Sequence, residues 1–523
     1  MFDGIVDTLA QKPSTTDDDE LERLRDTIPG NGNSGTAFEN GHDEQLKQSP
    51  LIWWDVKQHL AKQDTSGTGL SQYAVLGHVP DDEGRKPVLL NTNYPWSAFL
   101  CGSQGSGKSH TLSCMLENCL LTQPGIVARI GKTPNPLAGL VFHYDKSGWS
   151  GVSEASYLCS HISTTVLVSP SNYGDMKVQY ESMAEVYGGL QNLQVEPLYL
   201  SPSRLNLNHM LNLMAVNKNG EPPLYVNVIK SILRQLKLQN GGKGSLDLQA
   251  FESALSDHDF TDAQRAPMDQ RMDLLKSFLD LPPILQSEMK RGSLSMQGSL
   301  ASNRNHGSRS GNMVRTSQSP PAYDWKSYIP RPDYLAGEQG RLLIIDLTDP
   351  LIEAEMACAL FDICLSIFSQ QTKCNKIVTL DEAHNYMSNT TNDFTQNLIA
   401  TIRLQRHAST RVVIATQEPT LNTDLLDLCN ITMIHRFSSP SWLKVLKSHI
   451  AGVLLHEGGD EAGDHDLLRR INKLKLGESL LFCPTAAFKI VQENGIDEVQ
   501  KMAENFVKFR TRLRVTADGG ITR

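Results

Sequence analysis

The sequence predicts an α/β fold, in which a mostly parallel sheet with helices on both faces carries a phosphate-binding loop. Short apolar runs rich in Val, Ile and Leu alternate with long helical patterns, which is typical of strands buried on both faces. One such run, at 96–101, is followed directly by a glycine-rich stretch and then by a helical pattern with one apolar face. This order of strand, loop and helix favours a nucleotide-binding domain.

The glycine-rich stretch GSQGSGKS, at 102–109, matches the pattern G-x-x-x-x-G-K-[ST]. Glycines let consecutive N–H groups face phosphate oxygens, and the N-terminus of the following helix adds partial positive charge. We expect Lys108 to reach the β- and γ-phosphates of ATP and the Ser109 hydroxyl to ligate Mg²⁺. The expected ATP-binding residues are Gly102, Ser103, Gln104, Gly105, Ser106, Gly107, Lys108, Ser109 and His110. The alternative is a glycine-rich turn that binds nothing.

Pattern and composition divide the chain into segments. We expect a disordered acidic tail (1–50), a short strand-rich lead-in (51–96), the first part of the nucleotide domain with a helical insertion (97–284), a disordered basic insertion rich in Ser, Asn, Gly and Arg (285–325), the second part of the domain (326–492), and a C-terminal helix and tail (493–523). Strands are expected at 96–101, 139–145, 164–168, 340–347, 375–382, 410–417, 431–437 and 478–484. Helices are expected at 108–121, 223–239, 245–256, 262–281, 350–370 and 394–407.

Composition sets limits on the class of protein. A chain of 523 residues with 39% hydrophobic and 20% charged residues can bury a sizeable core. The most apolar stretch, at 351–368, carries three carboxylates and is not a membrane span. Nine cysteines form no C-x-x-C pair, so we expect reduced core thiols and no cysteine metal site. The acidic N-terminus lacks a secretion signal, which favours an intracellular protein, with cytoplasm and nucleus equally open.

Hydrolysis needs a second set of groups, and two later strands supply them. The run at 375–382 ends in Asp381 and Glu382, where the first carboxylate can hold Mg²⁺ and the second can polarise the attacking water. Asp346 also ends a strand, but only Asp381 is followed by another carboxylate, so we expect Asp346 to be buried and structural. Gln417, at the end of the next strand, can sense the γ-phosphate. We assign no catalytic role to His384.

The order of these stretches resembles the HerA/FtsK family of P-loop ATPases. The resemblance covers roughly 70–484 and rests on GSQGSGKS, LVFHYDKSG, GRLLIIDLTDP, KIVTLDEAHNYM, the segment 402–437 and LKLGESLLFCP. It implies a RecA-like core with an additional strand and a catalytic glutamate, which assembles into hexameric rings and pumps DNA or, in secretion relatives, polypeptide. It also implies Lys108 and Ser109 on the nucleotide and Mg²⁺, Asp381 on the metal, Glu382 as the base and Gln417 as the sensor.

The resemblance extends to arginines. Arg403 and Arg406 match the arginine-rich helix that precedes the glutamine strand, and at a subunit edge such residues reach the γ-phosphate of a neighbouring subunit. A solvated helix face is the alternative interpretation. Arg436 matches a further family arginine, with an intersubunit or a packing role.

Three functions remain open at this point. The favoured one is an ATP-hydrolysing oligomeric motor, a helicase or translocase that acts on nucleic acid or polypeptide. The alternative is a nucleotide-gated interaction protein that hydrolyses slowly and recruits partners through its acidic and Ser/Arg-rich segments. A P-loop kinase is disfavoured, because the carboxylate pair and the glutamine suit attack by water. The net charge of −9 does not distinguish these functions, because residues 1–50 alone carry a net charge of −7.

Overall fold

The computed structural model describes residues 46–63, 70–81, 84–146, 151–215, 225–239, 241, 248–281, 331–387, 393–419, 421–449, 461–493 and 496–519. Most of the predicted acidic tail and the whole predicted basic insertion at 285–325 lie outside these residues. At the end of the predicted tail, a turn is closed by a hydrogen bond from Ser49 N to Leu46 O. The described residues between Pro50 and Gly519 form one compact unit.

Strands from both halves of the chain join one sixteen-stranded sheet. The strands are β1 (Leu51–Trp53), β2 (Tyr73–His78), β3 (Pro87–Leu90), β4 (Ser97–Cys101), β5 (Gly131–Lys132), β6 (Ala138–His143), β7 (Ser163–Val168), β8 (Leu193–Pro197), β9 (Arg341–Asp346), β10 (Lys376–Leu380), β11 (Thr410–Thr416), β12 (Ile431–Ile434), β13 (Glu478–Phe482), β14 (Ala487–Glu493), β15 (Ile496–Lys501) and β16 (Phe506–Thr511). Each strand predicted between 96 and 484 is present.

The helices are α3 (Trp54–Gln63), α4 (Lys108–Leu120), α5 (Pro124–Ile130), α6 (Tyr173–Val186), α7 (Leu207–Ala215), α8 (Tyr225–Gln239), α9 (Leu248–Ser256), α10 (Asp262–Ser277), α12 (Ala354–Gln370), α13 (Asp393–Arg403), α14 (Gln405–Ala408), α15 (Thr423–Leu428), α16 (Pro440–His449) and α18 (Glu461–Asn472), with 3₁₀ turns that include η1 (Glu154–Ser160) and η6 (Ala383–Asn385). In the part of the chain that the structure describes, no helix is both long and apolar enough to cross a bilayer. The apolar stretch 351–368 becomes α12, a helix buried along most of its length.

The strand order is that of a P-loop nucleotide-binding core. Eight neighbouring strands run parallel in the order β12-β4-β11-β10-β6-β9-β7-β8. The strand of the glycine loop, β4, and the strand of the two acids, β10, are therefore separated by β11, the additional strand that the resemblance implies. Since parallel strands end at one edge of the sheet, the loop, the acids and the glutamine are brought to the same edge.

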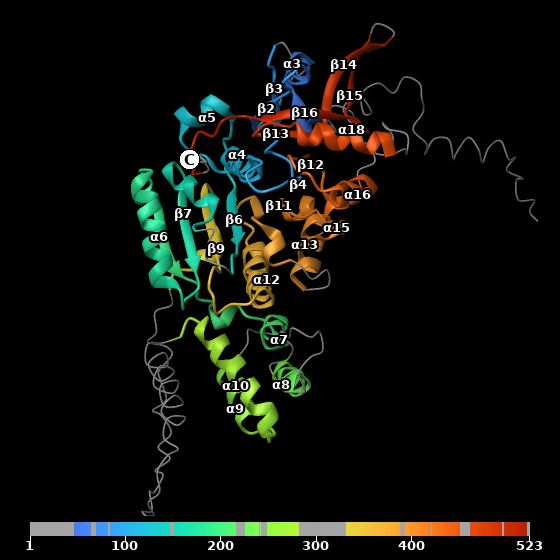
Figure 1. Cartoon of the computed structure of the whole chain (residues 1–523). Helices are drawn as coiled ribbons and strands as arrows, with labels where there is room; N and C mark the ends of the chain where they lie inside the picture. The colour runs from blue at the N-terminus through green and yellow to red at the C-terminus, as the bar shows by residue number, and fades with distance from the viewer. Residues whose placement is uncertain are drawn as a thin grey trace, which may run out of the picture. The chain divides into compact units, whose positions relative to one another are not determined.

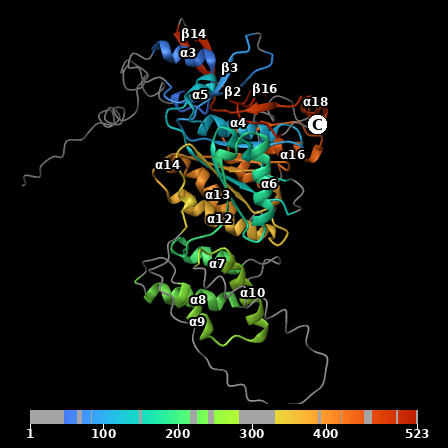
Figure 2. The same ribbon diagram turned by 90° about the vertical axis from the view of Figure 1, so that its left-hand side faces the viewer.

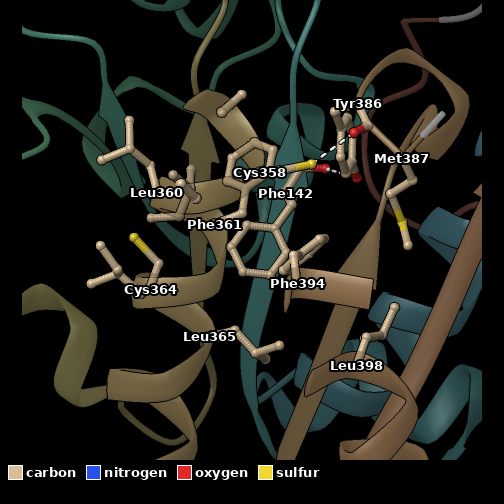
Figure 3. Packing of buried hydrophobic residues seen from close by; sticks show 14 of the residues in the cluster. Phe142, Cys358, Leu360, Phe361, Cys364, Leu365, Tyr386, Met387, Phe394 and Leu398 are labelled. Atoms are coloured by element: carbon tan, nitrogen blue, oxygen red, sulfur yellow. Dashed lines mark hydrogen bonds between the residues drawn. The ribbon is translucent and has the colours of Figure 1, made fainter. Parts of the chain in front are cut away.

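Helices cover both faces of this parallel half (Figure 1). Side chains alternate along a buried strand, so Phe142 of β6 packs with α12 and α13, whereas Val141 packs on the face that α4 covers. Four aromatic rings fill the first of these cores: Phe361 lies 4.7 Å from Phe142 and 5.0 Å from Tyr386 between ring centroids, and Phe394 closes the group (Figure 3). This core lies directly behind the ends of β6 and β10.

The predicted helical insertion forms α7 to α10, which pack together (Figure 2). Asp362 of α12 connects it to the sheet core, since its carboxylate accepts hydrogen bonds from Asn212 of α7 at 3.0 Å and from Asn397 of α13 at 2.6 Å. Burial raises the pKa of Asp362.

Two expectations need correction. Residues 496–511 are not a helix but the strands β15 and β16, and β16 is inserted between β13 and β2. The lead-in contains the predicted strands β1, β2 and β3 and also a helix, α3. In β16, a partner outside the local sequence decides the structure, since Phe506 pairs with Phe482 of β13.

Candidate nucleotide site

The loop between β4 and α4 has the backbone geometry that its glycines allow. Gly102 and Gly107 have φ values of 153° and 103°, which residues with a side chain rarely adopt. A Cβ at Gly107 would lie 2.9 Å from the Gly477 nitrogen, and one at Gly102 would lie 2.7 Å from the His435 Cβ. The loop thus packs closely on the strand ends beside it, and α4 begins at Lys108.

Hydrogen bonds made by Lys108 and Ser103 hold the loop in place. The Lys108 side chain is almost fully buried, and its Nζ donates to the Ser103 carbonyl at 3.2 Å. Ser103 donates to the Arg436 carbonyl from its backbone nitrogen at 2.9 Å and from its hydroxyl at 2.8 Å. The loop is therefore anchored to the end of β12, and a single carbonyl holds the ammonium that would bind phosphate.

Asp381 follows β10 at the same edge of the sheet. Its backbone nitrogen donates to Phe142 O at 3.0 Å, and its Oδ2 lies 3.8 Å from Nδ1 of the buried His143. Burial raises the pKa of Asp381 to about 6, while the His143 ring and the Lys108 ammonium lower it and the Glu382 carboxylate raises it. The loop lysine and both acids are thus close enough to interact electrostatically.

Glu382 has a left-handed backbone, with φ 46° and ψ 46°, which is rare for a residue with a side chain and costs conformational energy. Its two carboxylate oxygens each accept from Gln417 Nε2 at 3.2 Å, and Oε2 lies 3.4 Å from His384 Nδ1. Burial lowers the pKa of His384, whereas the Glu382 and Glu418 carboxylates raise it. The predicted base and sensor are therefore in direct contact.

Two buried oxygens fit the expected ligands. Among the described residues, the Ser106 hydroxyl and Asp381 Oδ1 have no hydrogen-bond partner. A buried polar atom without a partner costs free energy, which phosphate oxygens or a hydrated cation would recover. No cluster of three His, Cys, Asp or Glu side chains able to hold a metal occurs in the described part of the chain. Mg²⁺ needs no such cluster, since it takes one or two protein ligands together with phosphate oxygens and water.

Some predicted residues lie elsewhere. The His110 ring is held by the C-terminal segment, with Nε2 2.8 Å from Arg512 O and Nδ1 3.5 Å from an Asp518 carboxylate oxygen. Arg403 and Arg406 are exposed on α13 and α14, and they precede β11 at the sheet edge opposite the loop. Arg436 is exposed beside the loop, where its carbonyl anchors Ser103.

Asp346 is buried and structural, as expected. Its carboxylate accepts hydrogen bonds from the Tyr180 hydroxyl and from Thr348 N. Ser109, the predicted Mg²⁺ ligand, is half-buried in the first turn of α4, and Gln104 and Gly105 are exposed at the tip of the loop.

The sequence prediction includes neither His143 nor His435, two buried histidines at the site. His143 is buried, and neither of its ring nitrogens has a hydrogen-bond partner among the described residues. His435 is fully buried behind Gly102, and His384 contacts both Glu382 and Gln417. The available signal was position: His143 and His435 are polar residues at the carboxyl ends of strands next to those that carry the motifs.

The loop, the strand order and the acids at one edge define a P-loop NTPase fold with an additional strand, which is the fold that the resemblance to the HerA/FtsK family implies. The chain is similar to VirB4 of Thermoanaerobacter pseudethanolicus, with 12% identity and a TM-score of 0.39 over 85% of this chain and 97% of that one. It is similar to the plasmid coupling protein TrwB in complex with a GTP analogue, with 11% identity and a TM-score of 0.38 over 82% and 90% of the chains.

A third similar structure is the genome packaging NTPase B204 from Sulfolobus turreted icosahedral virus 2 with ATP-γS, with 12% identity and a TM-score of 0.22 over 28% of this chain and 64% of that one. No family model matches the chain. No curated protein matches it either. With TM-scores this low, the assignment of the fold rests on the strand order and loop of the chain itself.

Proposed function

We propose that this chain is an ATP-hydrolysing P-loop ATPase of the HerA/FtsK type that works as an oligomeric motor on DNA or polypeptide. The observation that supports it most is the contact between Gln417 and both carboxylate oxygens of Glu382, beside Asp381 and the buried Lys108. Four side chains from two adjacent strand ends and one loop thus combine what binding and hydrolysis require.

Each residue has a distinct task in this proposal. Lys108 binds the β- and γ-phosphate oxygens, and the N–H groups of 107–109, at the start of α4, face the phosphates. Glu382 accepts a proton from the attacking water while Gln417 orients the carboxylate and the water. The water oxygen bonds to the γ-phosphorus as the bond to the β,γ-bridging oxygen breaks, which gives ADP and phosphate. Ser109 and Asp381 would hold Mg²⁺, which when bound neutralises phosphate charge.

Two substitutions test the hydrolytic site. Lys108→Ala is expected to lose ATP binding and turnover together, because the phosphate charge loses its partner. Glu382→Gln is expected to keep ATP binding but to slow turnover by about 10²-fold or more, the scale of a lost general base. Steady-state turnover and binding of a fluorescent ATP analogue separate these effects, with Glu338→Gln, an exposed acid, as the control. Full activity of Glu382→Gln would contradict the assignment.

The motor proposal needs its own test. Single- or double-stranded DNA is expected to raise ATP turnover most strongly at low salt, where phosphate contacts are strongest. Particle mass with and without a slowly hydrolysed ATP analogue should show a ring. A monomer in both conditions, together with no stimulation by DNA, would favour the nucleotide-gated interaction protein instead.

A further inference from the structure

The last described residues, 512–519, form a segment that we term the C-terminal strap. It leaves β16 at the same sheet edge as the glycine loop, since Arg510 pairs with Glu478 and Thr511 N donates to Gly477 O at 3.1 Å. It then crosses α4, the helix that begins at Lys108 (Figure 1). The far end rests on η1, where Ala517 N donates to the Ser160 hydroxyl at 3.0 Å.

A fully buried carboxylate on α4 holds the strap. Glu117 has no exposed surface, and its oxygens accept from the nitrogens of Val515 and Thr516, at 3.1 Å and 2.9 Å, and from the Thr516 hydroxyl. Arg512 adds an ion pair to the same carboxylate at 2.6 Å. Among the described residues, every hydrogen-bond and ion-pair partner of this carboxylate belongs to the strap, so α4 buries this charge only while the strap is in place.

Arg512 is the centre of the contact. Its guanidinium is 10% exposed and also donates to Asn118 Oδ1 at 2.8 Å, while its Nε donates to Val75 O at 2.8 Å. One planar side chain therefore connects the strap, α4 and β2, a task that the guanidinium geometry suits.

The strap also reaches the first turn of α4, where the nucleotide would bind. The Arg512 carbonyl and the Asp518 carboxylate hold the ring of His110, which directly follows Ser109. The Thr511 hydroxyl lies 2.9 Å from that of Thr111, and Gly477, which is bonded to Thr511, packs against Gly107. The strap thus contacts α4 at both ends of a stretch of two helical turns, from His110 to Glu117.

We propose that the C-terminal strap positions the nucleotide-binding loop and its helix, with Arg512 and Glu117 as positioning residues, so that ordering of the strap and nucleotide binding favour each other. The inference rests on the proposed nucleotide binding. If the loop binds phosphates only when α4 is held at its N-terminal turn, a bound nucleotide stabilises the strap, and loss of the strap contact weakens binding by the same factor.

The test uses the full chain and a slowly hydrolysed fluorescent ATP analogue. In the wild type, the analogue is expected to slow amide hydrogen exchange within 512–519. Arg512→Ala is expected to weaken analogue binding by about tenfold, within the usual range of coupling between two sites. The matched control is Arg510→Ala, an exposed arginine two residues earlier, in β16.

The possible outcomes separate the strap proposal from the proposed function. Slower exchange in the strap together with weaker binding by Arg512→Ala but not Arg510→Ala supports the proposal. Wild-type binding with unchanged exchange in 512–519, or wild-type affinity in a folded Arg512→Ala, overturns it and leaves the proposed function intact. If Arg512→Ala does not fold, the exchange result in the wild type decides alone. A wild type that does not bind the analogue ends both proposals.

Discussion

At the scale of the residue, the site depends on side chains that their neighbours hold in place. Glu382 holds a left-handed backbone that only its surroundings can enforce, and Gln417 fixes both of its oxygens. The motifs predicted which residues meet here, because Asp381, Glu382 and Gln417 each end a readable strand. The strained backbone of Glu382 was not predictable, since it depends on which strands become neighbours, and His143 and His435 carried only the signal of their position at strand ends.

His435 makes the stability of the fold depend on pH. Burial, followed by the Lys108 ammonium, lowers the pKa of His435 to about 3. The unfolded chain takes up a proton at this ring below about pH 6.5, whereas the native ring stays neutral down to about pH 3. The unfolded state therefore binds more protons within this window, and stability falls as the pH decreases, by up to about 1.4 kcal/mol per pH unit.

We expect His435→Gln to flatten this part of the pH profile of stability, because the glutamine side chain takes up no proton in either state. Denaturant midpoints measured between about pH 4 and 7 check the slope. The control is His407→Gln, which changes an exposed histidine on α14 and should keep the wild-type slope. A profile for His435→Gln that is parallel to the wild type would contradict the prediction.

At the scale of the element, most strands of the parallel core were predicted, whereas β14, β15 and β16 near the C-terminus were not. Continuous apolar runs such as 410–417 are buried on both faces, so their composition alone marks them as strands. In the C-terminal segment, by contrast, Met502, Phe506 and Phe509 recur at helical spacing, although the chain there forms β16. The pairing of this strand with β13 and β2 overrides the local pattern.

The aromatic core behind the acid strand should carry much of the stability of this region. Phe361 is fully buried between Phe142, Tyr386 and Phe394, and Tyr386 follows the turn that carries Glu382. Phe361→Ala is expected to destabilise the fold by about 3–5 kcal/mol, the usual cost of removing a buried ring. The free energy of unfolding, measured with denaturant, gives this loss of stability. Leu351→Ala, at a side chain that is 79% exposed, should stay within about 0.5 kcal/mol of the wild type.

At the scale of the whole molecule, the positions of Arg403 and Arg406 bear on whether the proposed site lies within one chain. Arg403 and Arg406 lie before the first residue of β11, whereas Gln417 lies after its last. A strand of seven residues is about 23 Å long, so these arginines do not reach a phosphate bound in the loop of their own chain. If they take part in hydrolysis, they act on the nucleotide of a neighbouring subunit, and the assembly completes the site.

Mixing two inactive variants tests this arrangement. A chain with both Arg403→Ala and Arg406→Ala keeps its own loop but offers no arginine to a neighbour, while Lys108→Ala keeps the arginines and lacks the loop lysine. In a mixed ring, an intact loop beside intact arginines should restore part of the turnover that each variant alone lacks. Turnover measured across mixing ratios should therefore pass through a maximum. If mixed rings form and turnover stays at the level of the separate variants, or if the double arginine variant alone is fully active, the two arginines belong to a solvated helix face.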